Sequence, residues 1–365
     1  MSLEYLNQAI NFLIRASSFI ESTQLEDGSW TFGQKQKGDC YITAQGIIAL
    51  CNTRSPDTLN LIKAAEFLKN SRNADFGWGR DPSPTVSDVQ TTSLCCIAIK
   101  KISETTDAVS KGIEWLLNNQ NEDGSFKDLI APSGSLKATT HALLALGYFQ
   151  AHTPVESINK AINWLKDTQT VDGGWGAIPG MADTAACTAS VLEVVTEHNW
   201  CDFLTDGCYL KAKNQIQKLK TKKGYILDQH HKYNVEATSL SAIGLLNNGL
   251  SPTERVVLEP FRWTIGSQRE NGSLPEQAGA TGVEDICASA DSINFVSKWL
   301  HRYIELHPYI LIGNLEYLSS LEFNFDADKK DRELIPVGEE RTKKSIINLK
   351  FFRHEWGKTS KFEKK

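Results

Sequence analysis

The stretch KAINWLKDTQTVDGGW, residues 160–175, decides the fold of this 365-residue chain. It contains a basic residue, a small residue, an aromatic–aliphatic pair, a glutamine, a glycine and a closing aromatic residue, which are Lys160, Ala161, Trp164, Leu165, Gln169, Gly173 and Trp175. Copies that begin at residues 15 and 111 match this pattern closely, and weaker copies begin at residues 63, 211 and 259. The pattern therefore recurs every 48 to 51 residues, which predicts a repeat architecture of six units.

Each copy predicts a pair of helices. In the fourth copy, residues 157–168 have apolar side chains at helical spacing, and Gly173 follows in a turn that favours positive φ. Residues 183–195 then form a small, apolar segment that is almost without charge, which is typical of a buried helix. One amphipathic and one buried helix per copy indicate an outer ring of helices around an inner ring.

The string from Lys160 to Trp175 resembles the QW motif of squalene and oxidosqualene cyclases, and the whole repeat resembles the prenyltransferase/squalene-cyclase repeat family. This resemblance implies an all-α fold, an α6–α6 toroid of six helical hairpins. It also implies that the motif glutamine stacks on the aromatic residue of a neighbouring repeat, which joins the outer helices. The toroid is expected over residues 1–306, followed by a terminal helix over 307–328 and a charged, basic tail over 329–365.

The charge distribution excludes a nucleic-acid-binding body. The chain carries a net charge of −5, yet the tail from residue 329 has twelve Lys and Arg against six Asp and Glu, so the rest is strongly acidic. We expect the tail to be solvated or to dock on a protein partner or a membrane surface. No apolar stretch approaches the ~20 residues of a membrane helix, and the eight cysteines lack a disulfide framework, so a cytoplasmic protein is predicted.

Carboxylates near the inner-helix starts are the candidate catalytic residues. The resemblance to class II terpene cyclases implies a motif Asp-x-Asp-Asp-Thr-Ala, whose middle aspartate protonates an alkene. The nearest match here reads Asp88-Val89-Gln90-Thr91-Thr92, with Gln90 in place of the acid, and glutamine cannot donate a proton as a carboxylic acid does. The candidate proton donors are therefore carboxylates at several inner-helix starts, namely Asp88, Asp183, Glu284 and Asp285.

A linear isoprenoid is the predicted substrate. We expect the residues that bind it to lie at one mouth of the ring, because they stand at or just inside the predicted inner-helix starts. They are Gln90, Tyr41, His141, Tyr233 and Glu236. Carboxylates and aromatic faces are the groups that carbocation chemistry requires, since a carboxylic acid supplies the proton and an aromatic face stabilises the cation.

Two alternatives to a cyclase remain open at this stage. Acidic residues at helix starts commonly serve as helix caps. If that is their role here, the chain is a non-catalytic toroid that acts as a protein-interaction module. A chain that resembles the β-subunit of protein prenyltransferases would bind zinc, with Asp183, Cys187 and one of His141, His230 or His231 as ligands. The sequence predicts no cofactor, and it has no Asp-Asp-x-x-Asp motif for magnesium, although neither metal is excluded.

Overall fold

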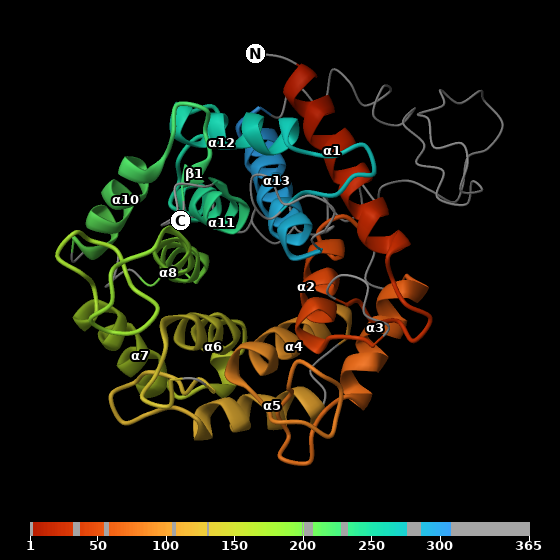
Figure 1. The fold of residues 1–365 in the computed structure, drawn as a ribbon, viewed down its shortest axis with the longest axis vertical. Coiled ribbons are helices and arrows are strands. Elements are labelled where there is room, and N and C mark those ends of the chain that lie inside the picture. The colour runs from red at the N-terminus through yellow and green to blue at the C-terminus, as the bar shows by residue number, and fades with distance from the viewer. Residues whose placement is uncertain are drawn as a thin grey trace, which may run out of the picture.

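The chain forms a double ring of helices in its computed structural model, which describes residues 3–31, 37–54, 58–103, 107–129, 131–198, 200, 207–227, 233–275 and 286–307 (Figure 1). Outer and inner helices alternate along the chain, and the inner helices surround the ring axis. The outer helices are α1 (Leu3–Ser22), α3 (Leu59–Asn70), α5 (Asp107–Asn118), α7 (Val155–Asp167), α10 (Cys208–Leu219) and α12 (Arg255–Gly266). The inner helices are α2 (Cys40–Leu50), α4 (Val89–Ile102), α6 (Leu136–Tyr148), α8 (Ala185–Glu197), α11 (Val235–Asn247) and α13 (Ile286–Leu306). The predicted all-α toroid of six hairpins is confirmed.

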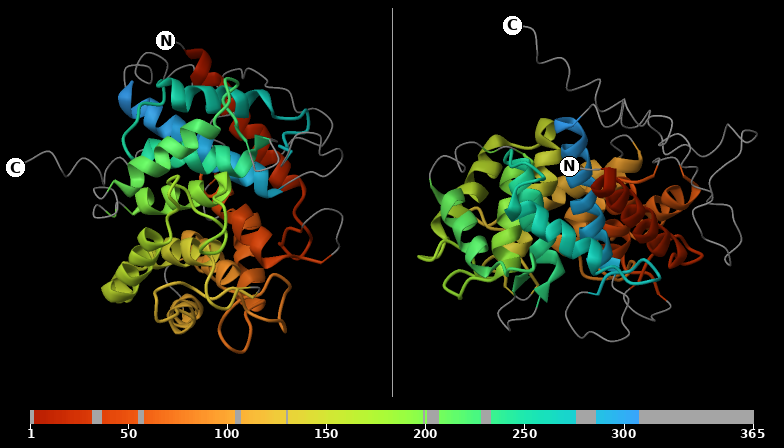
Figure 2. Two further views of the ribbon diagram at one scale, coloured as in Figure 1. Left: turned by 60° about the vertical axis from the view of Figure 1, so that its left-hand side comes forward. Right: turned by 90° about the horizontal axis from the view of Figure 1, so that it is seen from above.

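Short elements complete the described ring. The 3-10 helix η1 (Gln150–His152) follows α6, and β1 (Ile226–Leu227) pairs antiparallel with β2 (Tyr233–Asn234) before α11. The view from above in Figure 2 (right) shows the ring from its edge, with the outer helices beside the inner ones along the ring axis.

The repeat motif joins the two helices of each hairpin, as the fourth copy shows. Gly173 has φ 92°, and a Cβ there would lie 2.7 Å from the Cβ of Lys211 on the next outer helix. The turn thus needs a glycine both for its backbone angle and for close packing. The indole nitrogen of Trp175 donates to the Leu165 carbonyl at 2.7 Å, and its backbone N–H donates to the Thr188 hydroxyl at 3.1 Å. The motif therefore connects the end of an outer helix to the following inner helix.

The motif glutamine joins neighbouring outer helices through backbone hydrogen bonds. Gln169 donates to the carbonyls of Gly173 and Cys208, both at 2.9 Å, and Cys208 begins the next outer helix. The same link recurs from Gln24 to Asn60, from Gln120 to Ser157, and from Gln268 to Phe12. The last of these connects the sixth repeat to the first and closes the ring, together with Arg15, which donates to the Arg269 carbonyl at 2.7 Å. The link that the structure shows is therefore a hydrogen bond to a backbone carbonyl of the adjacent outer helix, in its first turn for α3, α7 and α10 and in its middle for α1. The predicted stacking of the glutamine on an aromatic residue stays a prediction.

Replacement of Gln169 by leucine is expected to lower the free energy of unfolding by about 1–2 kcal/mol, because two hydrogen bonds are lost. The control is Gln150→Leu, which makes the same change at an exposed position of η1 and should alter stability by less than about 0.5 kcal/mol. Urea unfolding of both variants measures the difference. Equal effects would show that the link contributes nothing specific.

The region after the ring lies outside the described residues. Helix α13 ends at Leu306, so the predicted terminal helix over 307–328 and the basic tail over 329–365 stay predictions. None of the helices described here is long and apolar enough to cross a membrane.

Candidate active site

One hydroxyl residue marks the same position in each inner helix. Its oxygen accepts the backbone N–H of the residue that closes the preceding turn, at 2.9 to 3.1 Å. The six residues are Thr43, Thr92, Thr139, Thr188, Thr238 and Ser289. Counting from this residue aligns the inner helices position by position.

Four positions of each inner helix point toward the ring axis. They lie two residues before the marker and two, five and nine residues after it, a spacing that follows a single helix face. Contacts across the ring support this assignment. Lys137 of α6 pairs with Glu236 of α11 past the intervening α8, and Lys298 of α13 pairs with Glu197 of α8 at 2.6 Å past α11. We call these positions layers 1 to 4 and the centre of the ring, which their side chains face, the lumen.

The layers differ in polarity from the helix N-termini, at layer 1, to the C-termini, at layer 4. Layer 1 contains Tyr41, Gln90, Lys137, Ala186, Glu236 and Cys287. Layer 2 contains Gln45, Leu94, His141, Ser190, Leu240 and Asp291. Layer 3 contains Ile48, Ile97, Leu144, Glu193, Ile243 and Asn294. Layer 4 is polar throughout, with Asn52, Lys101, Tyr148, Glu197, Asn247 and Lys298.

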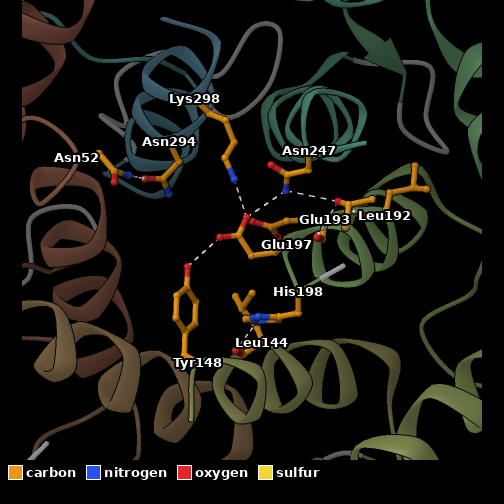
Figure 3. Close-up of polar contacts among 11 residues, drawn as sticks. Asn52, Leu144, Tyr148, Leu192, Glu193, Glu197, His198, Asn247, Asn294 and Lys298 are labelled. Atoms are coloured by element: carbon orange, nitrogen blue, oxygen red, sulfur yellow. Dashed lines mark hydrogen bonds and ion pairs between the residues drawn. The ribbon is translucent and has the colours of Figure 1, made fainter. Parts of the chain in front are cut away.

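Glu197 is the centre of a hydrogen-bond network in layer 4 (Figure 3). Its carboxylate accepts the Tyr148 hydroxyl and the Asn247 amide, both at 3.0 Å, and pairs with Lys298. Burial by itself raises the pKa of Glu197, but the Lys298 ammonium and the three hydrogen bonds outweigh it and lower the pKa to about 2. Glu197 is therefore ionised at any ordinary pH.

Glu193 lies one helical turn before Glu197 on the same face of α8 (Figure 3). Burial, followed by the negative charge of Glu197, raises the pKa of Glu193 to about 7. Charges from three other helices also act on it, since Lys298 and Lys137 lower its pKa and Glu236 raises it. Over the range below about pH 7 the Glu193 carboxyl thus holds its proton while the neighbouring Glu197 carboxyl is ionised, an arrangement that separates a proton donor from an anion.

The other end of the lumen holds an ion pair and a neutral histidine. The pair of Lys137 and Glu236 spans layer 1, and although burial raises the pKa of Glu236, the ammonium lowers it overall. Burial and the nearby Lys137 charge lower the pKa of His141 to about 4. His141 Nδ1 lies 2.8 Å from the Lys137 carbonyl oxygen, which can only accept, so Nδ1 carries the proton. The Nε2 atom of His141 is then an unprotonated base.

Four of the five predicted substrate-binding residues lie in the layers. Tyr41, Gln90 and Glu236 belong to layer 1 and His141 to layer 2, and the Tyr41 and His141 ring centroids are 6.2 Å apart across the lumen. Gln90 donates to the Asp128 carboxylate at 3.0 Å. Tyr233 occupies β2 instead, where its ring packs against Tyr225 and Trp263. The first four side chains are therefore brought together, and Tyr233 is not.

The two predicted acids in the described ranges, Asp88 and Asp183, lie outside the layers. Asp88 is the N-cap of α4 and accepts the Thr91 N–H at 2.8 Å, and burial raises its pKa. The Asp183 carboxylate accepts the side-chain amide of Gln215 on the outer helix α10 at 2.7 Å, so it faces the outer ring. Glu284 and Asp285 lie outside the described residues. Asp88 thus caps α4, and its predicted role as a proton donor stays a prediction.

The proposed zinc ligands do not converge in the part of the chain that the structure describes. No group of three His, Cys, Asp or Glu residues is close enough there to hold a metal ion. Cys187 is buried in the ring wall, and the Asp183 carboxylate is bound to Gln215. His230 and His231 lie outside the described residues.

Glu193, Glu197 and Lys298 are functional candidates that the sequence did not predict. The predicted residues lie at or just inside the inner-helix starts, where helix caps and motif residues gather, whereas these three lie five and nine residues beyond the hydroxyl marker. The available signal was charge, since Glu193 and Glu197 are the carboxylates of the otherwise uncharged helix α8.

Comparison with known protein families gives matches in the first half of the chain. The family model described as squalene-hopene cyclase C-terminal domain matches residues 2–130 and 81–188. A squalene–hopene cyclase of Zymomonas mobilis is 33% identical over 125 residues, which are 31% of this chain and 19% of the relative. One of Bradyrhizobium diazoefficiens is 29% identical over 120 residues, or 29% of this chain and 18% of the relative. The chain therefore spans about a fifth of the length of these relatives.

Solved structures share the ring fold at low sequence identity. A type II terpene cyclase, MstE from Scytonema, in complex with geranylgeranyl dihydroxybenzoate, superposes with a TM-score of 0.66 and 17% identity, covering 82% of this chain and 99% of that one. A glycosidase superposes with a TM-score of 0.57 and 12% identity over 82% of this chain and 99% of its own. At these identities the similarity shows the fold alone.

Proposed function

Because the chain belongs to the squalene-hopene cyclase C-terminal domain family, we propose that it is a terpene-cyclase-like enzyme that binds a linear isoprenoid in its lumen. Protonation of an alkene starts the reaction, and Glu193 is the proton donor. The observation that carries this proposal is the Glu193–Glu197 pair, one turn apart on α8, in which one carboxyl holds its proton near neutral pH and the other does not. The acid of the family motif is Gln90 here, so a different lumen carboxyl must supply the proton.

Residues of the lumen supply the proton that starts the reaction and accept the proton that is lost at its end. The Glu193 carboxylic acid transfers its proton to one alkene carbon, a C–H bond forms, and the adjacent carbon becomes cationic. A second alkene attacks this carbon, closes a ring and moves the cation along the chain. Loss of a proton from a carbon next to the last cation restores a double bond. His141 is the proposed acceptor of this proton because its Nε2 is unprotonated and its side chain belongs to layer 2.

The lumen also supplies charge stabilisation for the cation. The Glu197 carboxylate stays ionised beside Glu193, and the inner helices direct their negative C-terminal ends to layer 4. Tyr148 and Tyr41 place aromatic rings at the two ends. Support also comes from MstE, which has the same fold and is a type II terpene cyclase with a prenylated substrate bound.

Turnover is expected to fall as pH rises through about 7, because the protonated form of Glu193 is the active one. The measurement is the rate of product formation, by mass spectrometry, from linear prenyl alcohols between about pH 5 and about pH 9. The Asp88→Asn variant should keep the same profile. A rate that is flat or rises through this range, or loss of turnover in Asp88→Asn with Glu193→Gln active, would assign the proton to another group.

A further inference from the structure

A basic surface lies on the outer helix α10 and the turn that follows it. Residues 208–223 contain six lysines and no Asp or Glu, whereas residues 1–206 contain 24 Asp and Glu against 15 Lys and Arg. The six are Lys211, Lys213, Lys218, Lys220, Lys222 and Lys223. Helix α10 lies at the outer edge of the ring, between α7 and α12 (Figure 1). A ring whose first four repeats are acidic therefore has a positive surface on one side.

Four of these lysines are exposed and have no ionic partner among the described residues. Lys211 and Lys218 are two helical turns apart, which places them on one side of α10, about 10 Å from each other along the helix. Lys222 and Lys223 follow in the turn after the helix. We call these four residues the basic face. Their charges are left for a partner outside the described ring.

The carboxylates that contact this region pair elsewhere. Glu259 of α12 pairs with Lys220 and also, at 2.5 Å, with Arg255, so this group of three keeps one positive charge. The Asp183 carboxylate accepts the side-chain amide of Gln215 on α10 at 2.7 Å. Neither carboxylate pairs with a lysine of the basic face.

Apolar side chains are exposed beside the basic face. Leu210, next to Lys211 in the chain, is 58% exposed. Val171 is fully exposed in the turn after α7. This turn packs against α10, since a Cβ at Gly173 would lie 2.7 Å from the Cβ of Lys211. The same turn has an exposed carboxylate, Asp172. Both apolar side chains are therefore near the Lys211 end of the basic face.

The composition of the basic face suits a lipid surface better than a protein partner. Protein interfaces are enriched in arginine and depleted in lysine, and defined carboxylate or phosphate sites favour the planar fork of arginine. Every charge of the basic face is a lysine, and clusters of four or more basic residues on an amphipathic helix are typical of binding to anionic headgroups. Exposed aliphatic side chains next to such a cluster can enter the boundary between headgroups and acyl chains.

We propose that the basic face docks the ring on the surface of a membrane that contains anionic lipids. The four lysines contact the headgroups, and Leu210 and Val171 enter the layer beneath them. This inference goes beyond the proposed function and does not depend on it. The two agree, because a linear isoprenoid dissolves in the apolar interior of a bilayer and a docked ring lies beside that source.

Vesicle sedimentation with the full chain tests the inference. Binding is expected to vesicles of phosphatidylcholine and phosphatidylglycerol in equal parts, and it should weaken as salt screens the lysine charges. Vesicles of phosphatidylcholine alone should bind about ten-fold more weakly. Equal binding to both kinds of vesicle would overturn the inference. Binding to polyglutamate but not to vesicles would also overturn it, because the surface would then belong to an acidic protein partner.

A triple variant locates the contact on α10. Lys218→Gln with Lys222→Gln and Lys223→Gln removes three exposed lysines and should lower the affinity for the anionic vesicles by about ten-fold or more. The basic tail from residue 329 is present in this variant as in the unmodified chain, so its contribution stays constant. An unchanged affinity would contradict the inference.

The matched control removes the same charge from three other outer helices. Lys63→Gln, Lys111→Gln and Lys160→Gln change α3, α5 and α7 at the repeat position that Lys211 has on α10. This variant should alter the affinity by less than about two-fold, because its lysines lie outside the basic face. A loss as large as that of the α10 variant would show that overall charge attracts the vesicles, and it would overturn the inference.

A second pair of variants tests the apolar contact. Leu210→Ser with Val171→Ser should lower the affinity for anionic vesicles by about three-fold or more, since both side chains lose their burial among the lipids. The control is Leu59→Ser with Val155→Ser, which are 66% and 69% exposed at the starts of α3 and α7. Equal effects of the two variants would contradict insertion at α10.

Discussion

Turnover in Glu193→Gln is expected to be lower than in the unmodified chain by a factor of about 100 or more, while the ring stays folded. Glutamine has nearly the shape of a protonated glutamate and can occupy the same site on α8, but it cannot transfer a proton to an alkene. General acid catalysis contributes about 100- to 10,000-fold to a rate, which sets the size of the loss. The measurement is product formation from prenyl alcohols, with circular dichroism to verify the fold.

The same variant should also change how the free energy of unfolding depends on pH, which replacement of a normally titrating glutamate would not do. The folded-state pKa of Glu193 is raised from 4.5 to about 7, so its contribution to stability is fully present below about pH 4.5 and is lost as pH rises through about 7. Since glutamine does not titrate, the variant should become more stable than the unmodified chain above about pH 7, by up to about 3 kcal/mol. A constant difference across pH would show that Glu193 titrates normally.

Lys298→Met is expected to destabilise the ring by about 3 kcal/mol at neutral pH. The change removes the positive partner of Glu197 and leaves its carboxylate in the lumen with two neutral donors. The side chains of Lys298 and Glu197 keep 35% and 24% exposure, which places the effect at the low end of the range for unpaired buried charges. Chemical unfolding at pH 7 measures it.

A double-mutant cycle separates pairing from packing. If the loss is the unpaired charge, Glu197→Gln combined with Lys298→Met should recover about half of it or more. The control is Lys111→Met, which breaks an exposed pair with Asp107 at 2.9 Å on α5 and should cost less than about 0.5 kcal/mol. Because the pKa of Glu197 is lowered to about 2, the network contributes above about pH 4.5 and its contribution disappears as pH falls through about 2. Equal losses in Lys298→Met and in the double variant would contradict this account.

The ring could be predicted from the sequence because its links are local and repeated. Gly173, Trp175 and Gln169 lie within seven residues, and each has a backbone or packing partner that recurs in other copies. The repeat contains both the residues that form the turn and the residue that bonds to the next outer helix. It therefore specifies the architecture even where a single copy lacks some of these residues. Copy five lacks the glutamine and the aromatic, yet Ile226 still donates its N–H to Thr238.

The candidate site was less predictable because it forms only when the ring closes. Glu193 and Lys298 are on helices four and six of the inner ring, and their proximity depends on how many repeats separate them. Position within a helix also mattered, since Asp183 faces the outer ring while Glu236, placed near another helix start, faces the lumen. Aligning all six inner helices on the hydroxyl marker is the step that would have ranked Glu193 as a lumen residue.

The titration of the Glu193 carboxyl tests the central claim most directly. Isotope labelling of the glutamate carboxyl carbons and NMR across about pH 4 to about pH 9 would follow it, with the resonance assigned as the one that Glu193→Gln removes. The account predicts a midpoint at about 7, with the carboxyl still largely protonated one unit below. A midpoint near the ordinary value of 4.5 would contradict it, because Glu193 would then be ionised and unable to start the reaction.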